Sequence, residues 1–366
     1  MRSTEFDFSA LHEQGVERIG ELNPYITLAC DLRCRYCYMF DFLERATDNT
    51  QLMEPRYLFD LVEHLNKVGG EMDRLTLLGG EPTLHPRVTE IANEIASMQV
   101  RERRMTTNAM GLHYLNLDKL KANAFDHVSV SIDGTTAATN DLTRGNHAFE
   151  KIVETLSLYK QAGVNMSVNY TVTNNNIDQL DDVVPFFSDM GVSIVNFHRA
   201  SVDGNAYNHL DLIVEPIRWV QARERLVDYL RRRGKDFPGV KVRIPYTFLT
   251  PQEIIGLNYQ PIQERNYHSP EGGHRLIVFP PTGRGRGLCY MSSDLIGQAG
   301  AELGTLGADG KFVWNERITN ELTAYRGSPS SNISTDLKGQ DVGIKSGNLV
   351  RVSHSFKAEF VTGTTP

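Results

Sequence analysis

The stretch that decides the fold is Cys30-Asp31-Leu32-Arg33-Cys34-Arg35-Tyr36-Cys37, a C-x3-C-x2-C run. It follows a short apolar stretch, Tyr25–Ala29, which is typical of a buried strand. Thiolates are soft ligands that suit iron, and the potential of an iron–sulfur cluster depends on what fills each iron's coordination sphere. A [4Fe–4S] cube has one iron more than this run has cysteines. The run therefore predicts a cluster with one iron open to a small chelating molecule.

A structural zinc site is the alternative interpretation of the same run. Zinc in such sites takes four closed ligands, commonly as two pairs of Cys or His. The only other cysteine is Cys289, so a zinc site would need a bridging histidine. Four cysteines in 366 residues, three of them crowded together, do not resemble an extracellular disulfide framework. The spacing favours the iron–sulfur cluster.

Further segments, taken with this run, resemble the radical S-adenosylmethionine (radical SAM) superfamily. Gly79-Gly80-Glu81-Pro82 looks like the GGEP motif of that family, and it follows the next expected strand. Ser129–Gly134 resembles the end of the fourth strand in the subgroup related to SPASM/twitch-domain enzymes. Arg144 falls where those relatives carry an arginine near the cofactor carboxylate. The resemblance covers about residues 21 to 215.

The resemblance implies a role for each cysteine and for the aromatic residue beside them. Cys30, Cys34 and Cys37 are expected to ligate iron in a [4Fe–4S] cluster. Tyr36, directly before the third cysteine, stands where the family places a backbone contact to the adenine of S-adenosylmethionine.

The resemblance also implies the remaining cofactor contacts. Glu81 is expected to accept hydrogen bonds from the methionine ammonium, while Gly79 and Gly80, before Pro82, let the backbone approach closely. Asn108, Ser131 and Arg144 are the candidates for the ribose and the carboxylate, and Asp133 is a further cofactor-binding candidate. An Asn after a strand is also a common turn residue, and this alternative stays open for Asn108.

In that family, a reduced cluster passes one electron to S-adenosylmethionine, and the 5′-deoxyadenosyl radical that results removes a hydrogen atom from the substrate. The implied cofactors are therefore a [4Fe–4S] cluster and S-adenosylmethionine. The implied partner is an external electron donor of the flavodoxin or ferredoxin type. The protein would bind, orient and shield the reacting groups.

The chain alternates between strand-like and helix-like patterns up to about residue 215. After the first strand, we expect strands over 74–78, 103–107, 127–132, 165–172 and 193–197, with helically spaced apolar residues between them. This order predicts a parallel sheet with crossover helices on its outside. We expect an α/β fold, a partial (β/α)6 TIM-like barrel, with every motif in loops at the carboxyl ends of the strands.

The predicted organisation has four segments: an N-terminal segment (1–20), the radical SAM barrel (21–215), a C-terminal α+β extension (216–326) and a Ser/Thr/Gly-rich tail (327–366). A helix from about Pro216 to Arg233 begins the extension, and Gly307–Gly310 is typical of a hairpin turn. The extension resembles a SPASM/twitch domain. Because Cys289 is its only cysteine, we expect no auxiliary cluster and redox-neutral or net-reductive chemistry.

Cys289 has two interpretations. It is either a small buried hydrophobic residue or a thiol that donates a hydrogen atom to a substrate radical. Radical epimerases of the superfamily resemble the second arrangement, with one cluster and one lone cysteine. Three histidines, His85, His198 and His209, are either acid–base groups near the barrel mouth or structural residues; His198, at the end of the sixth strand, is the best placed.

Composition limits the class of protein. The formal net charge of −7 argues against a broad nucleic-acid-binding face, which needs many basic residues. No apolar run approaches the about 18 residues of a membrane span, and the N-terminus lacks a signal-peptide pattern. We expect a cytoplasmic enzyme with no nucleic-acid or membrane partner.

The substrate is predicted from what precedes the barrel. Many peptide-modifying relatives carry a leader-binding module there, whereas about twenty residues precede the first strand here. We expect a small biosynthetic substrate of the natural-product, sugar or nucleoside type, and epimerisation as the reaction. Radical carbon–carbon coupling or dehydration of such a metabolite is the second hypothesis, and maturation of a ribosomal peptide is the third. A non-catalytic, cofactor-binding scaffold is the alternative outside enzymes.

Overall fold

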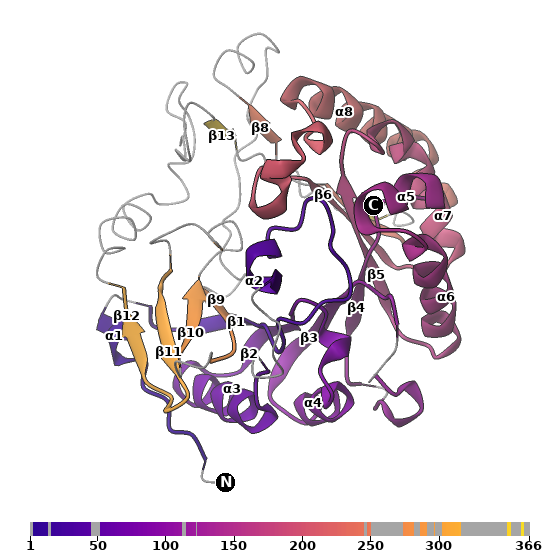
Figure 1. Cartoon of the computed structure of the whole chain (residues 1–366). Coiled ribbons are helices and arrows are strands. Elements are labelled where there is room, and N and C mark those ends of the chain that lie inside the picture. Colours follow the sequence, from indigo (N-terminus) through magenta and orange to yellow (C-terminus); the bar gives the residue numbers. More distant parts are fainter. Residues whose placement is uncertain are drawn as a thin grey trace.

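The computed structural model describes residues 3–13, 16–44, 52–111, 115–121, 123–244, 247–249, 274–281, 286–290, 296, 302–315, 350–352 and 360–361. Its central feature is a twelve-stranded sheet with the strand order β12-β11-β10-β9-β1-β2-β3-β4-β5-β6-β7-β14 (Figure 1). Six of these strands pair in parallel and in sequence order to form the barrel wall: β1 (Ile19–Pro24), β2 (Met72–Leu77), β3 (Val100–Thr107), β4 (His127–Ser131), β5 (Met166–Val172) and β6 (Ile194–Arg199). The predicted partial (β/α)6 barrel is confirmed.

Helices cover the outside of this wall (Figure 1). The longer ones are α3 (Pro55–Gly69), α4 (Val88–Ile95), α5 (Ala137–Arg144), α6 (Ala148–Gln161), α7 (Leu180–Asp189) and α8 (Pro216–Arg233). Two short helices are α1 (Ser9–Glu13) and α2 (Phe40–Glu44). Single 3-10 turns are η1 (Pro82–Leu84), η2 (Leu117–Lys119), η3 (Ile177–Gln179), η4 (Gly204–Asn208), η5 (Leu210–Leu212) and η6 (Gly234–Asp236).

Helix α3 shows how the sequence specifies this packing. Pro55 occupies its first turn, where a missing N–H costs nothing. Its apolar residues fall three or four positions apart and are fully buried: Leu58, Leu61 and Val62. The helix therefore packs one side on the sheet and turns the other to solvent.

The two faces of the sheet differ in chemistry. On the outer face, which the helices cover, Val130, Val168, Val195 and Val242 pair at one height and are fully buried. One position further along each strand, the inner face carries Ser131, Asn169, Asn196 and Arg243. Side chains alternate between faces along a strand, so the barrel has an apolar outer wall and a polar interior on this side.

The chain after residue 215 extends the sheet at both edges. β7 (Lys241–Arg243) adds in parallel beside β6, and β9 (His274–Val278) adds in parallel beside β1. β10 (Arg286–Tyr290), β11 (Gly304–Gly307) and β12 (Phe312–Trp314) continue antiparallel from β9, and β14 (Phe360–Val361) pairs antiparallel with β7. A separate pair consists of β8 (Thr247–Leu249) and β13 (Val350–Val352).

The expected hairpin turn at Gly307–Gly310 joins β11 to β12. The N–H of Gly310 donates to the carbonyl of Gly307 at 3.0 Å, and Gly310 has a φ of +81°. The predicted division into four segments stays a prediction, and most of 327–366 lies outside the described residues.

The N-terminal segment packs against this hairpin. The N–H of Phe312 donates to the carbonyl of Asp7 at 3.0 Å, and the ring of Phe8 lies 5.7 Å from that of Phe312. β1 lies wholly before Tyr25–Ala29, the stretch that the sequence indicated as a strand, since Tyr25 and Thr27 take part only in isolated bridges. In the described residues, no helix has the length and apolar character required to cross a membrane.

Candidate active site

The three cysteines lie on the loop that leaves β1 at the carboxyl end of the barrel strands. All three are free thiols and partly exposed. The N–H of Cys37 donates to the carbonyl of Cys34 at 3.1 Å, which makes a tight turn between them. The guanidinium of Arg33 donates to the carbonyl of Cys30 at 2.8 Å. The loop is therefore ordered by its own contacts.

Burial raises the pKa of all three thiols. It raises the pKa of Cys34 to about 12, although the nearby Arg144 guanidinium acts in the opposite direction. A thiol ligates metal only as the thiolate, and metal binding releases its proton. Three free thiols on one short loop fit an iron–sulfur cluster. The positive charge of its iron would stabilise the thiolates, which burial alone disfavours.

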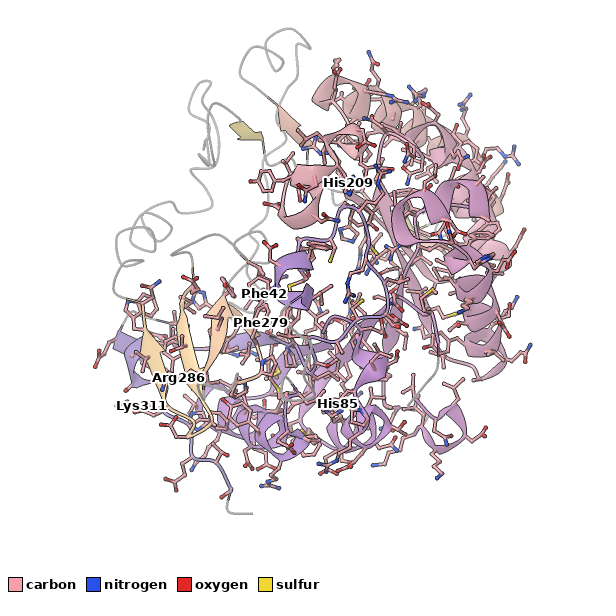
Figure 2. All side chains as sticks on the ribbon, viewed as in Figure 1. Phe42, His85, His209, Phe279, Arg286 and Lys311 are labelled. Atoms are coloured by element: carbon pink, nitrogen blue, oxygen red, sulfur yellow. The ribbon has the colours of Figure 1, made fainter. Side chains whose placement is uncertain are left out.

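An apolar cluster packs on one side of the cysteine loop. Tyr25 stacks on Phe279 with ring centroids 4.5 Å apart, and Phe42 lies 5.1 Å from Phe279 (Figure 2). Cys30 and Cys37 pack against this cluster. These contacts exclude water from one side of the sulfurs.

The GGEP loop is bonded directly to the backbone that precedes Cys30. The N–H of Gly80 donates to the carbonyl of Thr27 at 2.8 Å, and that of Glu81 donates to the carbonyl of Ala29 at 2.7 Å. A Cβ at Gly79 would lie 2.7 Å from the Thr27 carbonyl oxygen, and one at Gly80 would overlap the Ala29 carbonyl. Both glycines are thus required by the contact between two loops of this chain.

The carboxylate of Glu81 is buried and accepts four hydrogen bonds. Its Oε1 accepts from the N–H and the hydroxyl of Thr83 at 3.0 and 2.6 Å and from the hydroxyl of Thr107 at 2.6 Å. Its Oε2 accepts from the N–H of Asn108 at 2.6 Å. Burial raises the pKa of Glu81, and the four donors oppose that rise. The carboxylate therefore joins the loops after β2 and β3, and the expected contact to an ammonium stays a prediction.

Asn108 connects the loop after β3 to the cysteine loop. Its Nδ2 donates to Asp31 Oδ1 at 2.7 Å and lies 3.8 Å from the sulfur of Cys30. Hydrogen bonds to ligand sulfurs change the potential of a cluster. Asn108 is therefore not only a turn residue, since it reaches a predicted iron ligand.

Asp133, Arg144 and Tyr36 form one buried network. Asp133 is fully buried and accepts from Thr143 Oγ1 at 2.8 Å, Arg144 Nη2 at 3.0 Å, Tyr36 Oη at 2.5 Å and the N–H of Thr171 at 3.2 Å. Arg144 Nη2 also donates to Tyr36 Oη at 2.7 Å, and its Nε is buried with no partner in the described residues. The network connects the cysteine loop to the end of β4.

Ser131 lies on the inner face at the end of β4, beside Asn169 of β5. His198 occupies the same face of β6, pairs in register with Thr171 and is exposed toward the barrel interior. Although the side chain is accessible to solvent, the surrounding barrel residues partly desolvate the ring, which lowers the pKa of His198, and the charge of Asp133 opposes that shift. An imidazole in this setting favours the neutral form.

The loop after β6 is a part of the site that the sequence did not indicate. The N–H of Asn205 donates to the carbonyl of Cys37 at 3.0 Å, and its Nδ2 donates to the carbonyl of Cys34 at 3.3 Å. Gly204 has a φ of +54°, and a Cβ there would lie 2.5 Å from the Cys37 carbonyl oxygen. The Gly-Asn pair after the sixth strand was the available signal, since this backbone conformation favours glycine.

Cys289 requires a correction. It pairs with Val278 on the outer face of the sheet, is fully buried and belongs to the main apolar core. Its neighbours Leu288 and Tyr290 point the other way, into the cluster that contains Cys30. Because the sheet separates this thiol from the barrel interior, the hydrogen-donor interpretation is not supported, and the buried-residue alternative is. Cys289 also does not join the other cysteines as a fourth zinc ligand.

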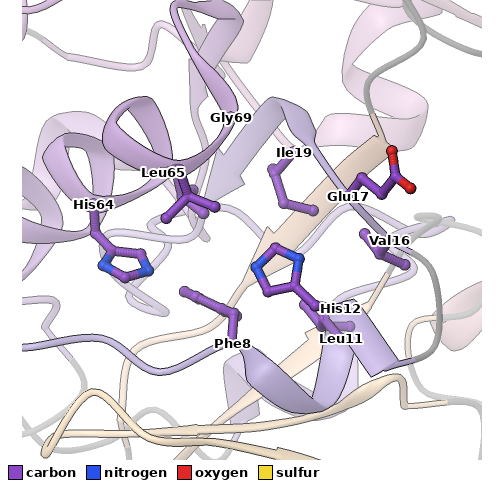
Figure 3. A pocket seen from close by; sticks show the side chains of 10 residues that line it. Phe8, Leu11, His12, Val16, Glu17, Ile19, His64, Leu65 and Gly69 are labelled. Atoms are coloured by element: carbon purple, nitrogen blue, oxygen red, sulfur yellow. The ribbon is translucent and has the colours of Figure 1, made fainter.

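Two of the noted histidines have structural partners. The ring of His85 is buried, with Nε2 3.2 Å from the carbonyl of Met53 and Nδ1 accepting from the N–H of Arg87 at 3.1 Å. His209, which Figure 2 labels, has its Nδ1 3.2 Å from Arg35 Nη2. A small pocket lined by Phe8, His12 and His64 lies between α1 and α3 (Figure 3), and no residue of the cysteine loop lines it.

Comparisons with known proteins agree with this geometry. Residues 25–187 match the sequence model of the Radical SAM superfamily. A probable GTP 3′,8-cyclase from Sulfurisphaera tokodaii is 29% identical over 198 residues, which cover 52% of this chain and 60% of that protein. A pre-heme d1 synthase from Dinoroseobacter shibae is 27% identical over 168 residues, covering 46% of this chain and 40% of that protein. The chain thus spans about three fifths or less of these two relatives.

Solved structures show the same fold. The crystal structure of Streptococcus suis SuiB bound to S-adenosylmethionine resembles this chain with a TM-score of 0.62 at 14% identity, over 90% of this chain and 73% of that one. At this identity the likeness concerns the fold alone.

Proposed function

Because residues 25–187 belong to the radical SAM superfamily, we propose that this chain cleaves S-adenosylmethionine reductively and starts radical chemistry on a small substrate. One observation carries the proposal: at the carboxyl end of the barrel, four other loops form hydrogen bonds to the cysteine loop. Those loops supply Gly80 and Glu81, Asn108, Asp133 and Asn205. When bound, the [4Fe–4S] cluster and S-adenosylmethionine supply an electron and a radical able to attack an unreactive carbon.

The protein's own residues control the environment of the sulfurs. Cys30, Cys34 and Cys37 would hold the cluster, with the apolar cluster around Phe279 keeping water from one side. Asn108 provides an N–H near the Cys30 sulfur, and Arg144 provides a positive charge near Cys34. Both groups stabilise negative charge on sulfur, which favours the thiolate form that binds iron.

The cofactor contacts follow from the same loops. Gly79, Gly80, Glu81 and Pro82 would bind the methionine amino group through the turn they form, and the backbone at Tyr36 would meet the adenine. Ser131 faces the interior, and we propose that it contacts the ribose. The carboxylate of Asp133 accepts hydrogen bonds from four groups of the protein. We therefore propose that Asp133 holds Arg144 and Tyr36 in position.

The substrate is proposed to be a small biosynthetic molecule of the sugar, nucleoside or other natural-product type. Two relatives are named for small molecules, a GTP cyclase and a pre-heme synthase, which supports this class. Epimerisation remains the first reaction proposed, with a hydrogen donor other than the buried Cys289 thiol. Radical coupling or dehydration is second. Peptide maturation is the third candidate, since the fold is also that of SuiB, which has been solved with its precursor peptide.

The electron donor is proposed to be an external flavodoxin-type or ferredoxin-type protein. The compartment is proposed to be the cytoplasm, where thiols such as those of the cysteine loop stay reduced. The alternative outside enzymes is a cofactor-binding scaffold that performs no turnover.

Anaerobic reconstitution tests the proposal. The purified chain is loaded with iron and sulfide, reduced with dithionite and mixed with S-adenosylmethionine. We expect the paramagnetic resonance signal of a reduced [4Fe–4S] cluster and the formation of 5′-deoxyadenosine. Cys34→Ser should lose both, whereas Cys289→Ser, the matched control at the buried cysteine, should retain both. A cluster without any 5′-deoxyadenosine would support the scaffold instead, and no cluster at all would overturn the proposal.

A further inference from the structure

The inner face of β4 to β7 forms a continuous polar wall. Asn196 Nδ2 donates to Asn169 Oδ1 at 3.1 Å, which links the two strands. The pair leaves the Nδ2 of Asn169 and the Oδ1 of Asn196 for other partners. The inner positions of these described strands are polar apart from Ile194: His127, Ser129, Ser131, Ser167, Asn169, Thr171, Asn196, His198, Lys241 and Arg243.

The opposite side of the barrel interior is apolar where it meets the cysteines. Tyr25, Leu78, Ile277 and Phe279 gather there with Cys30 and Cys37. The interior is therefore two-sided, with predicted iron ligands on an apolar side and hydrogen-bonding groups on the facing side. A substrate between them would present a carbon to the first side and its polar groups to the second.

Toward the amino ends of the strands, the inner face carries a ladder of charges. Arg275 lies 3.0 Å from Glu21, Arg74 lies 3.6 Å from Glu21 and 2.7 Å from Glu102, and Arg104 also pairs with Glu102. Three arginines thus share two glutamates. Arg243 faces the same interior, and its charge is one of those that act on His127. The excess of positive charge favours an anion.

Two buried polar atoms in this interior have no partner in the described residues. They are Oδ1 of Asn23, a residue 9% exposed, and Nδ1 of His127. Asn23 pairs with Ile277 and His127 with Arg104, so both belong to the inner face. Buried polar groups are normally hydrogen-bonded, and an exception calls for a bound molecule or water. These two atoms therefore leave hydrogen-bonding capacity in the interior for a water molecule or a polar ligand.

We propose that the substrate is a small, polar anion, whose phosphate or carboxylate binds near Arg104 and Arg74 while its neutral hydroxyl, amide or ring-nitrogen groups bind Asn169 and Asn196. The inference rests on the proposed function, since it names the substrate class of the same barrel. Apolar substrates are excluded by the cost of burying the wall's polar groups without partners. Amide side chains both donate and accept, so they suit sugar hydroxyls and nucleobase edges.

Calorimetric titration of the anaerobically reconstituted enzyme tests the proposal, with inorganic pyrophosphate and succinate as separate probes. We expect saturable binding of at least one, and the stronger of the two identifies the phosphate or the carboxylate class. Arg104→Gln should weaken this binding at least tenfold. Arg101→Gln is the matched control, since Arg101 lies on the same strand, faces the other side of the sheet and is 45% exposed. The Arg101→Gln variant should bind the probe as tightly as the unaltered chain does.

A second variant keeps the test decisive where loss of Arg104 prevents folding. Asn196→Asp preserves the shape of the side chain but adds a negative charge to the wall, so it should also weaken anion binding. The proposal is overturned when neither probe binds, or when both variants bind as well as the control. Formation of 5′-deoxyadenosine by the same preparation is measured in parallel, so a failed substrate assignment is distinguished from a failed enzyme assignment.

Discussion

The carboxylate of Asp133 and the guanidinium of Arg144 form an ion pair, 3.0 Å long, in which the side chains are 0% and 6% exposed. Asp133 follows β4 and Arg144 ends α5, so the pair fixes the helix to the strand end. Tyr36 bonds both partners and its ring lies 5.9 Å from the guanidinium carbon. The position of the cysteine loop therefore depends on a charge pair that is not itself an iron ligand.

Removing Arg144 is expected to destabilise the protein strongly. Arg144→Met leaves the Asp133 carboxylate buried with one donor fewer and no positive partner, which costs about 3–5 kcal/mol of unfolding free energy. Chemical denaturation of the apoprotein measures this loss. Arg218→Met breaks an exposed pair with Asp178 and should cost about 0–1 kcal/mol. Equal losses in the two variants would contradict the buried-pair argument.

Glu81→Gln is expected to separate the loops after β2 and β3. The glutamine amide cannot accept from Thr83 and Thr107 and also from the N–H of Asn108, because one of its ends is a donor. We expect a loss of about 2–4 kcal/mol, since a buried donor is left facing another donor. The cluster content after reconstitution should fall as well. Glu90→Gln, at an exposed pair with Arg87, should change neither quantity measurably.

Gly204→Ala tests the contact between the loop after β6 and the cysteine loop. The added methyl meets the carbonyl of Cys37 and the backbone of Tyr38, so one loop must move. We expect iron per chain after reconstitution to fall by at least half. Gly239→Ala is the matched control, because Gly239 also has a positive φ, +90°, but no atom within 4 Å of a Cβ. A similar loss of iron in both variants would attribute the effect to backbone strain alone.

Cys289→Ala tests the correction made from the structure. Removing a small buried group should cost about 1–2 kcal/mol through the cavity it leaves. The rate of 5′-deoxyadenosine formation and the incorporation of deuterium from heavy water into product should stay unchanged. A product that loses deuterium only in this variant would restore the hydrogen-donor interpretation.

The sequence predicted the parts of the fold that depend on local pattern. β4 was expected over 127–132 and spans His127–Ser131, because apolar residues and the following Asp-Gly both mark it. α8 was expected over Pro216–Arg233 and has these bounds. β10 was not predicted, since its short stretch Arg286–Tyr290 has two charged or glycine positions and is a strand through pairing with β9 and β11.

The sequence predicts those parts of the site whose residues are contiguous in the chain. It does not predict those parts that depend on which loops or strands lie side by side in the fold. The cysteine run and GGEP are each read from one segment. Asn205, in contrast, lies 168 residues after Cys37, and only the fold places it against that carbonyl. The outward orientation of Cys289 follows from its register with Val278, which a single cysteine in a sequence does not reveal.

His85 is expected to make the protein less stable in acid. Its burial lowers the pKa of the ring, although the contact to the Met53 carbonyl opposes that shift. The unfolded chain therefore binds the proton more readily than the folded one. The stabilisation is fully present above the ordinary pKa of about 6.5 and is lost as pH falls toward the lower folded pKa. Protonation of Nδ1 also removes the acceptor for the N–H of Arg87.

Denaturation series of His85→Asn and the unaltered chain, from about pH 7.5 to 5.5, measure this contribution. Asn retains an oxygen that can accept from the N–H of Arg87 but does not titrate, so the variant is expected to lose less stability over this range. His147→Asn, at a side chain 81% exposed, should follow the pH dependence of the unaltered chain. Because His127 and His198 also have lowered pKa values, some acid sensitivity will remain in His85→Asn. An identical slope in His85→Asn and the unaltered chain would show that burial does not hold the His85 ring neutral in the folded protein.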